Sequence, residues 1–225
     1  MPFKVLISRK ESADTTLGLG AEINGFQLLG VPFIETKEKF FKLAPQRPDW
    51  ILFTSKNGVK YFLEGAKEFD WGGVRIAAVG SGTANALLDW GLEAKLVPNY
   101  SDTDRFLEEF KALLEPAETV WYPSAVQTIG KVEKALKDSC KLHPFAVYQT
   151  MDKPKLLLEE FDLYFFTSPS NVRSFFKLNT IHTHAQVLAI GSSTLRELAK
   201  HGVQANIASG YTAQDILKDI KEAMS

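Results

Sequence analysis

The sequence of 225 residues has a single cysteine, Cys140, and its charges nearly cancel, with 26 Lys and Arg against 27 Asp and Glu. One cysteine excludes a framework of internal disulfides and is typical of a reducing compartment. The net charge of −1 disfavours binding of bulk nucleic acid, which depends on a positive field around the protein. An anionic small molecule stays compatible with this balance if local hydrogen-bond donors hold it.

Long apolar runs are also missing from the chain. The first ten residues carry too short an apolar stretch for a signal peptide, and no segment approaches the roughly 18 apolar residues of a membrane span. We therefore expect a soluble protein of the cytoplasm. At about 150 residues per domain, the length allows one large domain or two small ones.

The chain contains two related halves. Residues 51–62, ILFTSKNGVKYF, return at residues 164–175 as YFFTSPSNVRSF. Residues 78–83, AVGSGT, return at residues 189–194 as AIGSST. We interpret the chain as an internal duplication in which two related units cover nearly all of its length.

Each unit alternates short apolar runs with amphipathic stretches, which is typical of parallel strands joined by helices. Helices are expected between the strands, for example over residues 103–114 and 212–224. Five strands per unit predict an α/β protein with two doubly wound domains. The expected strands lie near residues 3–8, 27–34, 50–53, 74–79 and 94–97, and near 118–122, 143–148, 161–166, 186–190 and 204–207.

The pattern leaves the assembly of the two domains open. Charged, proline-containing stretches at residues 37–49 and 151–160 follow the second strand of each unit. Two tandem domains would cross near residue 116. In the alternative, the chain would cross near residue 36 and again near residue 150, so that each opening βαβ segment completes the other unit's sheet. Both arrangements satisfy the right-handed crossover rule.

Four loops of similar composition each follow an expected strand and open a helix. Their glycines and hydroxyl residues leave backbone N–H groups free at the positive end of a helix, which suits an anion. Serine and threonine are also preferred helix N-caps, so capping and ligand binding both explain each loop. The loops are Thr54-Ser55-Lys56-Asn57-Gly58, Gly80-Ser81-Gly82-Thr83, Thr167-Ser168-Pro169-Ser170-Asn171 and Gly191-Ser192-Ser193-Thr194.

Patterns of metal, cofactor and nucleophilic catalysis are scarce. Residues 80–85, GSGTAN, lack the third glycine of a dinucleotide-binding loop. His182 and His184 have no third metal ligand nearby. Cys140 and His143 have no acidic or amide partner in the sequence. We therefore expect a reaction that needs neither a metal ion nor a covalent nucleophile.

Three other side chains could contact a ligand. Tyr148 ends an apolar run, and a phenol there can donate a hydrogen bond to a leaving hydroxyl, although it could also simply pack at a hinge. Arg9 follows the first expected strand and could hold a carboxylate bidentately or remain a solvated charge. Lys56 would oppose the dipole of the helix that it begins, so a ligand explains it better than helix stability does.

Five short segments, taken together, carry a family resemblance. They are FTSKNGV at 53–59, AVGSGTA at 78–84, VYQT at 147–150, FTSPSNV at 166–172 and AIGSST at 189–194. In order and spacing they resemble the uroporphyrinogen-III synthase family over about the whole chain, and residues 202–203 and 212–216 agree with it. Ser8-Arg9-Lys10 departs from the family's usual Thr-Arg-Pro but keeps the arginine.

The resemblance implies two similar flavodoxin-like α/β domains with parallel sheets, a two-stranded connector and a cleft between them. It implies the exchanged arrangement, with residues 1–36 and 150–225 in one domain and 37–149 in the other. The implied activity is the dehydrating cyclisation of hydroxymethylbilane to uroporphyrinogen III, with inversion of the last pyrrole ring, in tetrapyrrole (porphyrin and haem) biosynthesis. The implied enzyme uses no cofactor, and we expect a cytoplasmic monomer that binds neither nucleic acid nor a membrane.

The resemblance also implies roles for particular residues. Tyr148 would hydrogen-bond the departing hydroxyl, and hydroxyl, amide and basic residues of the loops would hold the substrate's carboxylates. These residues are Arg9, Thr54, Ser55, Lys56, Asn57, Ser81, Gly82, Thr83, Ser168, Pro169, Ser170, Asn171, Ser192, Ser193 and Thr194. A non-catalytic two-lobed binder of an anionic metabolite is the main alternative. A nucleotide-sugar transferase is a third interpretation, which the incomplete glycine loop disfavours.

Overall fold

The computed structural model describes residues 2–9, 25–98, 103–115, 117–210 and 213–225. The helix expected between the first two strands falls on residues 10–24 and lies outside the described residues, as does Thr212, the expected start of the last helix. The chain divides into two compact units. Unit 1 is Met1–Glu35 with Met151–Ser225, and unit 2 is Thr36–Thr150.

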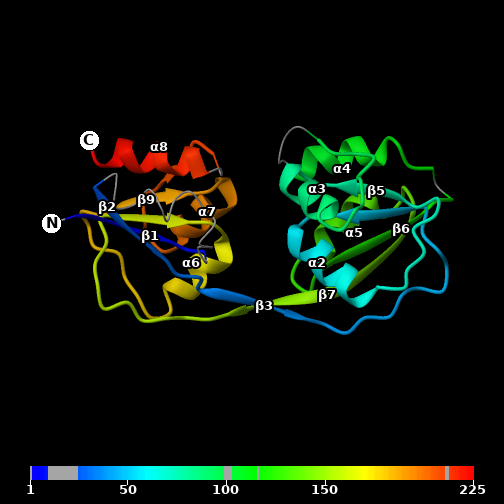
Figure 1. Cartoon of the computed structure of the whole chain (residues 1–225), viewed down its shortest axis with the longest axis horizontal. Coiled ribbons are helices and arrows are strands. Elements are labelled where there is room, and N and C mark those ends of the chain that lie inside the picture. Colours follow the sequence, from blue (N-terminus) through cyan, green and yellow to red (C-terminus); the bar gives the residue numbers. More distant parts are fainter. Residues whose placement is uncertain (1, 10–24, 99–102, 116, 211–212) are drawn as a thin grey trace. The chain divides into compact units, whose positions relative to one another are not determined.

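The sheet of unit 1 has five strands in the order β10-β9-β8-β1-β2 (Figure 1). Each neighbouring pair in it runs parallel. Strands from both ends of the chain therefore share one sheet. The strands are β1 (Phe3–Ile7), β2 (Phe26–Gly30), β8 (Leu163–Phe166), β9 (Gln186–Ala189) and β10 (Asn206–Ile207).

The sheet of unit 2 has the order β3-β7-β6-β4-β5. The β7-β6, β6-β4 and β4-β5 pairs run parallel. Leu96 adds one isolated parallel bridge to Ala77, so the strand expected over 94–97 is wrong and only a single bridge forms there. The strands are β3 (Ile34–Glu38), β4 (Trp50–Phe53), β5 (Arg75–Ala78), β6 (Thr119–Ala125) and β7 (Lys141–Asp152).

Helices cover both faces of each sheet (Figure 1), and the alternation of strand side chains explains how. In β4, Ile51 and Phe53 join the core cluster that contains α2, whereas Trp50 and Leu52 face α4 and α5. Strands that are buried on both faces confirm the doubly wound α/β class. The helices of unit 2 are α2 (Lys56–Gly65), α3 (Ser81–Leu88), α4 (Thr103–Lys111) and α5 (Ile129–Leu136).

Unit 1 repeats this arrangement. In β8, Tyr164 and Phe166 pack with residues of α6 and α7, and Leu163 and Phe165 pack with α8. The helices are α6 (Pro169–Phe175), α7 (Ser192–Lys200) and α8 (Ala213–Ala223). The strands of the two sequence repeats also take equivalent places, because β8 and β9 are neighbours in unit 1 as their counterparts β4 and β5 are in unit 2. The common order supports the duplication.

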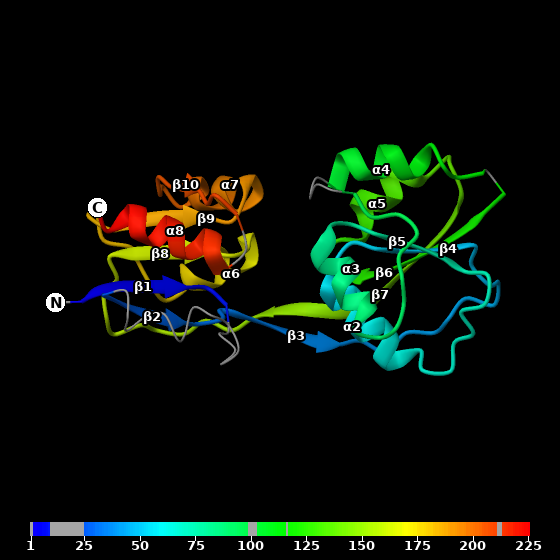
Figure 2. The same cartoon turned by 45° about the horizontal axis from the view of Figure 1, so that its top comes forward.

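Strands β3 and β7 form a two-stranded ribbon (Figure 2). The Lys39 N–H donates to the Val147 carbonyl (2.9 Å), and the Lys153 N–H donates to the Phe33 carbonyl (2.8 Å). Because residue numbers rise along one strand as they fall along the other, the pair is antiparallel. Both passages of the chain between the units lie in this ribbon. Strand β3 was not among the expected strands, because it lies at the edge of the sheet and consists largely of charged, partly exposed residues.

The described helices contain at most 11 residues. None of those in the described parts of the chain is long and apolar enough to cross a membrane.

Candidate functional site

The loop between β4 and α2 begins the helix with a serine cap. Ser55 has extended backbone angles, and its Oγ accepts a hydrogen bond from the Gly58 N–H (3.0 Å). A Cβ on Gly58 would lie 3.0 Å from the Pro123 carbonyl oxygen and 3.3 Å from Ser55 Oγ. The first turn of α2 therefore packs closely against the carboxyl end of β6, and glycine makes this approach possible.

Tyr148 of β7 reaches the same loop. Its side chain belongs to a buried core cluster and is 7% exposed, and its Oη lies 3.2 Å from Ser55 Oγ. Its ring stacks on that of Tyr61, with centroids 5.4 Å apart and an interplanar angle of 21°. The two alternatives raised for Tyr148 thus coexist, because the ring packs in the core while the hydroxyl contacts a polar loop.

The surroundings of Tyr148 raise the pKa of its phenol. Burial is the largest cause, and the neighbouring phenols of Tyr122 and Tyr61 act in the same direction, while the hydrogen bond with Ser55 opposes them. A phenol with a raised pKa keeps its proton at neutral pH. Tyr148 is therefore a hydrogen-bond donor rather than a base.

Two tyrosines that were not predicted as site residues lie near the phenol of Tyr148. Tyr122 is 1% exposed, and its Oη lies 3.2 Å from Thr54 Oγ1. Tyr61 lies on α2, and its Oη donates to the Thr36 carbonyl (2.9 Å). Both looked like ordinary core residues in the sequence, because a polar tip on a buried ring leaves no mark on hydrophobic periodicity.

Lys56 places a cation beside the next helix of unit 2. A Cβ on Gly82 would lie 2.7 Å from Lys56 Cε and 3.4 Å from its Nζ, so the lysine lies against the first turn of α3. No side chain caps α3, whose N-cap Gly80 has φ 77°. Among the residues described, no carboxylate forms an ion pair with Lys56. A cation at a positive helix end is unfavourable by itself and favourable with an anion bound there.

The equivalent loop of unit 1 is held by amide and hydroxyl groups. Ser168 Oγ caps α6 by accepting from the Asn171 N–H (3.2 Å), and Asn171 Nδ2 donates back to it (2.9 Å). Asn171 Oδ1 accepts from the Phe33 N–H (2.9 Å). Asn171 is 4% exposed, so its amide serves the fold here, and a contact with ligand stays a prediction.

Strands β1 and β8 are tied together where they end. The Thr167 N–H donates to Ser8 Oγ (2.8 Å), and Thr167 Oγ1 donates to the Ser8 carbonyl (2.9 Å). Arg9 follows directly, is half-buried, and donates its backbone N–H to the Ile7 carbonyl (2.9 Å). Arg9 thus lies at the carboxyl end of the sheet of unit 1, the edge that binds ligands in open α/β sheets.

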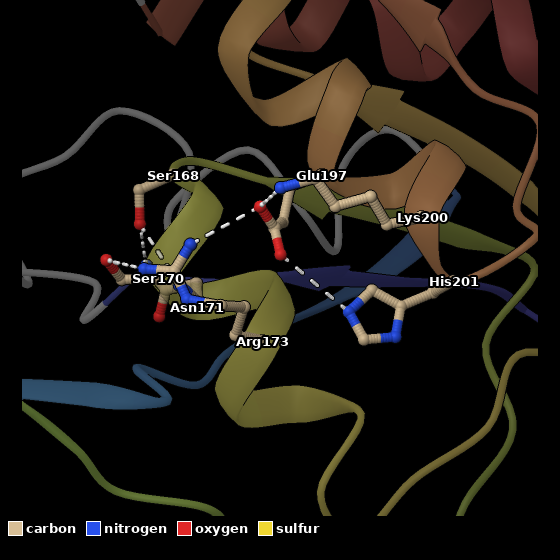
Figure 3. A network of polar contacts seen from close by, with 7 residues as sticks. All are labelled: Ser168, Ser170, Asn171, Arg173, Glu197, Lys200 and His201. Atoms are coloured by element: carbon tan, nitrogen blue, oxygen red, sulfur yellow. Dashed lines mark hydrogen bonds and ion pairs between the residues drawn. The ribbon is translucent and has the colours of Figure 1, made fainter.

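A network around Glu197 joins α6 to α7 (Figure 3). Glu197 is 7% exposed, and its Oε2 lies 3.0 Å from Lys200 Nζ and 3.4 Å from Arg173 Nη1. Arg173 Nη2 also donates to Ser170 Oγ (3.1 Å). The hydrogen bond from Lys200 is the main cause that lowers the pKa of Glu197. Its acidic position in α7 resembled a surface charge in sequence, and only the fold shows it buried.

The loop that opens α7 resembles that of α3. Its N-cap is Gly191, and no side chain caps the helix. Ser192 and Ser193 are exposed, whereas Thr194 is fully buried and its Oγ1 has no hydrogen-bond partner among the described residues. Of the four loops, those of α2 and α6 are thus capped by serine and those of α3 and α7 are not, which leaves the latter two better suited to an external anion.

The structure brings together predicted residues within each unit. In unit 2 it joins the loops at 54–58 and 80–83 with Tyr148, including Asn57 and Ser81 at the first turns of α2 and α3. In unit 1 it places the loop at 167–171, with Pro169 at the first position of α6, beside the end of β1. Each set lies at the carboxyl edge of its own sheet.

Histidines, acidic residues and the cysteine do not gather into a metal site within the described part of the chain. The described residues contain no group of three or more His, Cys, Asp or Glu that could hold a metal ion. Burial raises the pKa of the Cys140 thiol to about 11, so this cysteine stays protonated at neutral pH.

Fold and site define a class of protein: a two-domain, doubly wound α/β protein whose polar loops suit an anionic ligand. The family model described as "Uroporphyrinogen-III synthase HemD" matches residues 17–218 of the chain. The chain therefore belongs to the uroporphyrinogen-III synthase family.

Individual relatives are distant but cover most of the chain. It is 24% identical to "Uroporphyrinogen-III synthase, chloroplastic" of Oryza sativa subsp. japonica, over 90% of this chain and 74% of the relative. It is 25% identical to "Putative uroporphyrinogen-III synthase" of Methanothermobacter thermautotrophicus, over 89% of this chain and 90% of the relative.

Solved structures share the fold. Uroporphyrinogen-III synthetase of Helicobacter pylori aligns with a TM-score of 0.73 at 20% identity, covering 99% of both chains. A mutant uroporphyrinogen III synthase of Thermus thermophilus aligns with a TM-score of 0.67 at 22% identity, covering 99% of this chain and 98% of that one.

Proposed function

We propose that this chain converts hydroxymethylbilane into uroporphyrinogen III, closing the open tetrapyrrole with loss of water and inversion of the last pyrrole ring. The observation that carries the proposal is the family match over residues 17–218. The phenol of Tyr148 beside the start of α2 supports it with a hydrogen-bond donor.

In this proposal Tyr148 assists the first bond cleavage. The terminal C–O bond of the substrate breaks as the electron pair of its pyrrole nitrogen moves toward the carbon. The departing hydroxyl takes up negative charge, which a protonated phenol stabilises by donating a hydrogen bond or its proton. Burial raises the pKa of Tyr148, so the phenol stays protonated at neutral pH and acts chiefly as a hydrogen-bond donor.

Ring closure then needs geometry more than further acid–base groups. The azafulvene cation left behind is attacked by the substituted carbon of the last pyrrole, which forms a spiro intermediate that rearranges to the inverted ring. The closing pyrrole loses one proton as it regains aromaticity, so the net loss is one water. Favouring this closure over the uninverted one by a hundredfold to a thousandfold takes only ~3–4 kcal/mol of differential barrier.

The carboxylates of the substrate are proposed to bind at the loops of both units. Lys56 and the uncapped start of α3 supply a cation and free N–H groups. Ser192 and Ser193 at the uncapped start of α7 supply a second set of hydrogen-bond donors. Backbone donors suit a ligand with many carboxylates in a protein of net charge −1. Arg9 and the hydroxyl groups of the capped loops are proposed as further contacts.

An assay of product isomers tests the proposed function. Hydroxymethylbilane closes without enzyme to isomer I, so the purified chain is expected to shift the product to isomer III, as measured by chromatography after oxidation. A heat-denatured sample of the same protein is the control. Isomer I alone, at several protein concentrations, would show that the chain does not catalyse this reaction.

We also propose that the protein works as a monomer in the cytoplasm, which size-exclusion chromatography and fractionation can test.

A further inference from the structure

Tyr61 contacts Tyr148 and the connector ribbon at the same time. It is 7% exposed, and its ring stacks on Tyr148 at 5.4 Å. Its hydroxyl donates to the Thr36 carbonyl (2.9 Å) and lies 2.8 Å from Thr36 Oγ1. Since the tyrosine proton goes to the carbonyl, the threonine hydroxyl is the donor in the second contact.

These contacts link the Tyr148 phenol, helix α2 and the connector ribbon to one another. Thr36 lies on β3, and Tyr148 lies on β7, its partner in the ribbon. Tyr61 lies on α2, the helix that Ser55 caps. Helix α2 therefore holds Tyr148 in two ways, at the ring through Tyr61 and at the hydroxyl through Ser55.

The Tyr61 hydroxyl is not needed to fill the core. Phenylalanine would keep the ring and the stacking, whereas tyrosine adds two hydrogen bonds to one residue of the ribbon. A stacked ring that is also anchored at its tip cannot slide along its neighbour. It therefore restricts the tilt of the Tyr148 ring and, with it, the position of the Tyr148 hydroxyl.

We propose that Tyr61 is a positioning residue for the reaction, and that its bonds to Thr36 hold the Tyr148 phenol in line with the leaving hydroxyl. This inference rests on the proposed role of Tyr148. Tyr61 itself touches no reacting atom. Its effect is expected on turnover more than on binding, because a misdirected donor weakens an interaction made only in the transition state.

Steady-state kinetics of Tyr61→Phe test the proposal. We expect kcat to fall about tenfold, within the ~10²-fold that misplacement of a reacting group can cost. KM should change by less than about twofold, since the loops that hold carboxylates are untouched. The fraction of isomer III should fall, because slower catalysis leaves more substrate to close without the enzyme.

The decisive measurement repeats Tyr61→Phe in a Tyr148→Phe background. If Tyr61 acts through Tyr148, the second substitution should leave the residual kcat of Tyr148→Phe unchanged. The same loss in both backgrounds would show a general structural effect and overturn the inference. A slow Tyr148→Phe with a fully active Tyr61→Phe would also overturn it. Should Tyr148→Phe itself turn over normally, the proposed role of Tyr148 is wrong and this inference falls with it.

Three further variants separate the proposed effect from a simple folding defect. Tyr164→Phe removes a buried phenol from unit 1, whose Oη accepts from the Phe161 N–H (3.4 Å), and it should leave kcat unchanged. Thr36→Val removes one of the two bonds to Tyr61, so it should lower kcat by a smaller factor, and Thr36→Ser should restore it. If Tyr61→Phe does not fold, the Thr36 pair carries the test, and equal kcat for valine and serine contradicts the proposal.

Discussion

At Tyr148, burial and one hydrogen bond set what the side chain can do. The phenol is 7% exposed and its pKa is raised by burial, so it keeps a proton at neutral pH. Among the described side chains, its one polar contact is with Ser55 Oγ, at 3.2 Å. A protonated donor with one weak partner is free to exchange that partner for a leaving group.

Tyr148→Phe should therefore lower kcat by about 10²-fold or more, the usual contribution of a general acid. The fold should survive, because the substitution removes one hydrogen bond worth roughly 0.5–1.5 kcal/mol and keeps the packed ring. Initial rates of isomer III formation and urea unfolding measure the two effects. Wild-type turnover in a folded variant would remove the tyrosine from the mechanism.

Lys56 offers a second test, because its charge should matter in opposite ways with and without ligand. Lys56→Gln removes a cation from the positive ends of α2 and α3, which should raise the free energy of unfolding of the ligand-free protein by about 0.3–1 kcal/mol. The same change should raise KM several-fold. Lys67→Gln, just beyond the end of α2, is the matched control and should leave KM unchanged. A lower stability together with an unchanged KM would contradict an anion site at Lys56.

At the scale of the elements, two helix starts are capped and two are open. Ser55→Ala and Ser168→Ala each remove a cap that accepts from a backbone N–H. We expect each to lower the free energy of unfolding by about 1 kcal/mol. Ser81→Ala and Ser192→Ala, at uncapped helices, should cost much less and serve as controls. Urea denaturation measures all four, and equal losses would show that the loops do not differ in this way.

The pairing of α6 with α7 depends on the charge of Glu197. Its pKa is lowered in the folded protein, chiefly by the hydrogen bond from Lys200. A lowered folded pKa gives stability that is present above the unfolded pKa of about 4.3 and is lost as pH falls through the folded value. Burial of the carboxylate makes its partners matter more than in an exposed pair.

Glu197→Gln should accordingly lower the free energy of unfolding at pH 7 by about 1–3 kcal/mol, and the difference from wild type should shrink below about pH 4. Glu222→Gln on α8 removes an exposed pair with Lys218 (3.8 Å) and should cost less than about 0.5 kcal/mol. Unfolding curves at several pH values measure both. A difference that grows toward low pH would have the wrong sign and contradict the ion-pair account.

At the scale of the whole molecule, the two units differ in continuity. All five strands of the unit 2 sheet, β3 to β7, lie in one stretch of chain, whereas unit 1 needs both ends of it. A fragment of residues 34–152 should therefore fold alone and unfold cooperatively in urea. The tandem half 1–115 should not fold, because it lacks β6 and β8, so that β4 keeps only β5 and β1 keeps only β2 as a sheet neighbour. Circular dichroism of both fragments checks this, and a folded 1–115 would contradict it.

Much of the fold follows from local pattern. Nine of the ten strands expected from apolar runs form in the structure. The repeated FTS segments and the GSGT and GSST segments marked the starts of four helices. The strand at Ile34–Glu38 was missed because its pairing with β7, rather than any alternation of its own, holds it together. The strand expected at 94–97 forms only one bridge, from Leu96 to Ala77. An apolar run by itself does not ensure that a neighbouring strand pairs with it along its length.

The candidate site divides in the same way. The loops and Tyr148 could be predicted from composition and from the family resemblance. The partners that set their chemistry were not, because Tyr61 and Thr36 are 25 residues apart and Glu197 and Arg173 lie on different helices. Contacts of this kind depend on which strands pair and which helix faces meet.

The sequence by itself determined the duplicated α/β pattern, the family, and the polar loops at the ends of its strands, because helix caps, hydrophobic periods and turn residues are encoded over a few neighbouring positions. Only the tertiary structure shows that Ser55 meets Tyr148 and that Glu197 is buried, and it places strands from both ends of the chain in one sheet, a choice that the local pattern left open. Each of these depends on long-range packing, where burial and hydrogen bonding between distant segments choose one arrangement among several that local preferences allow equally.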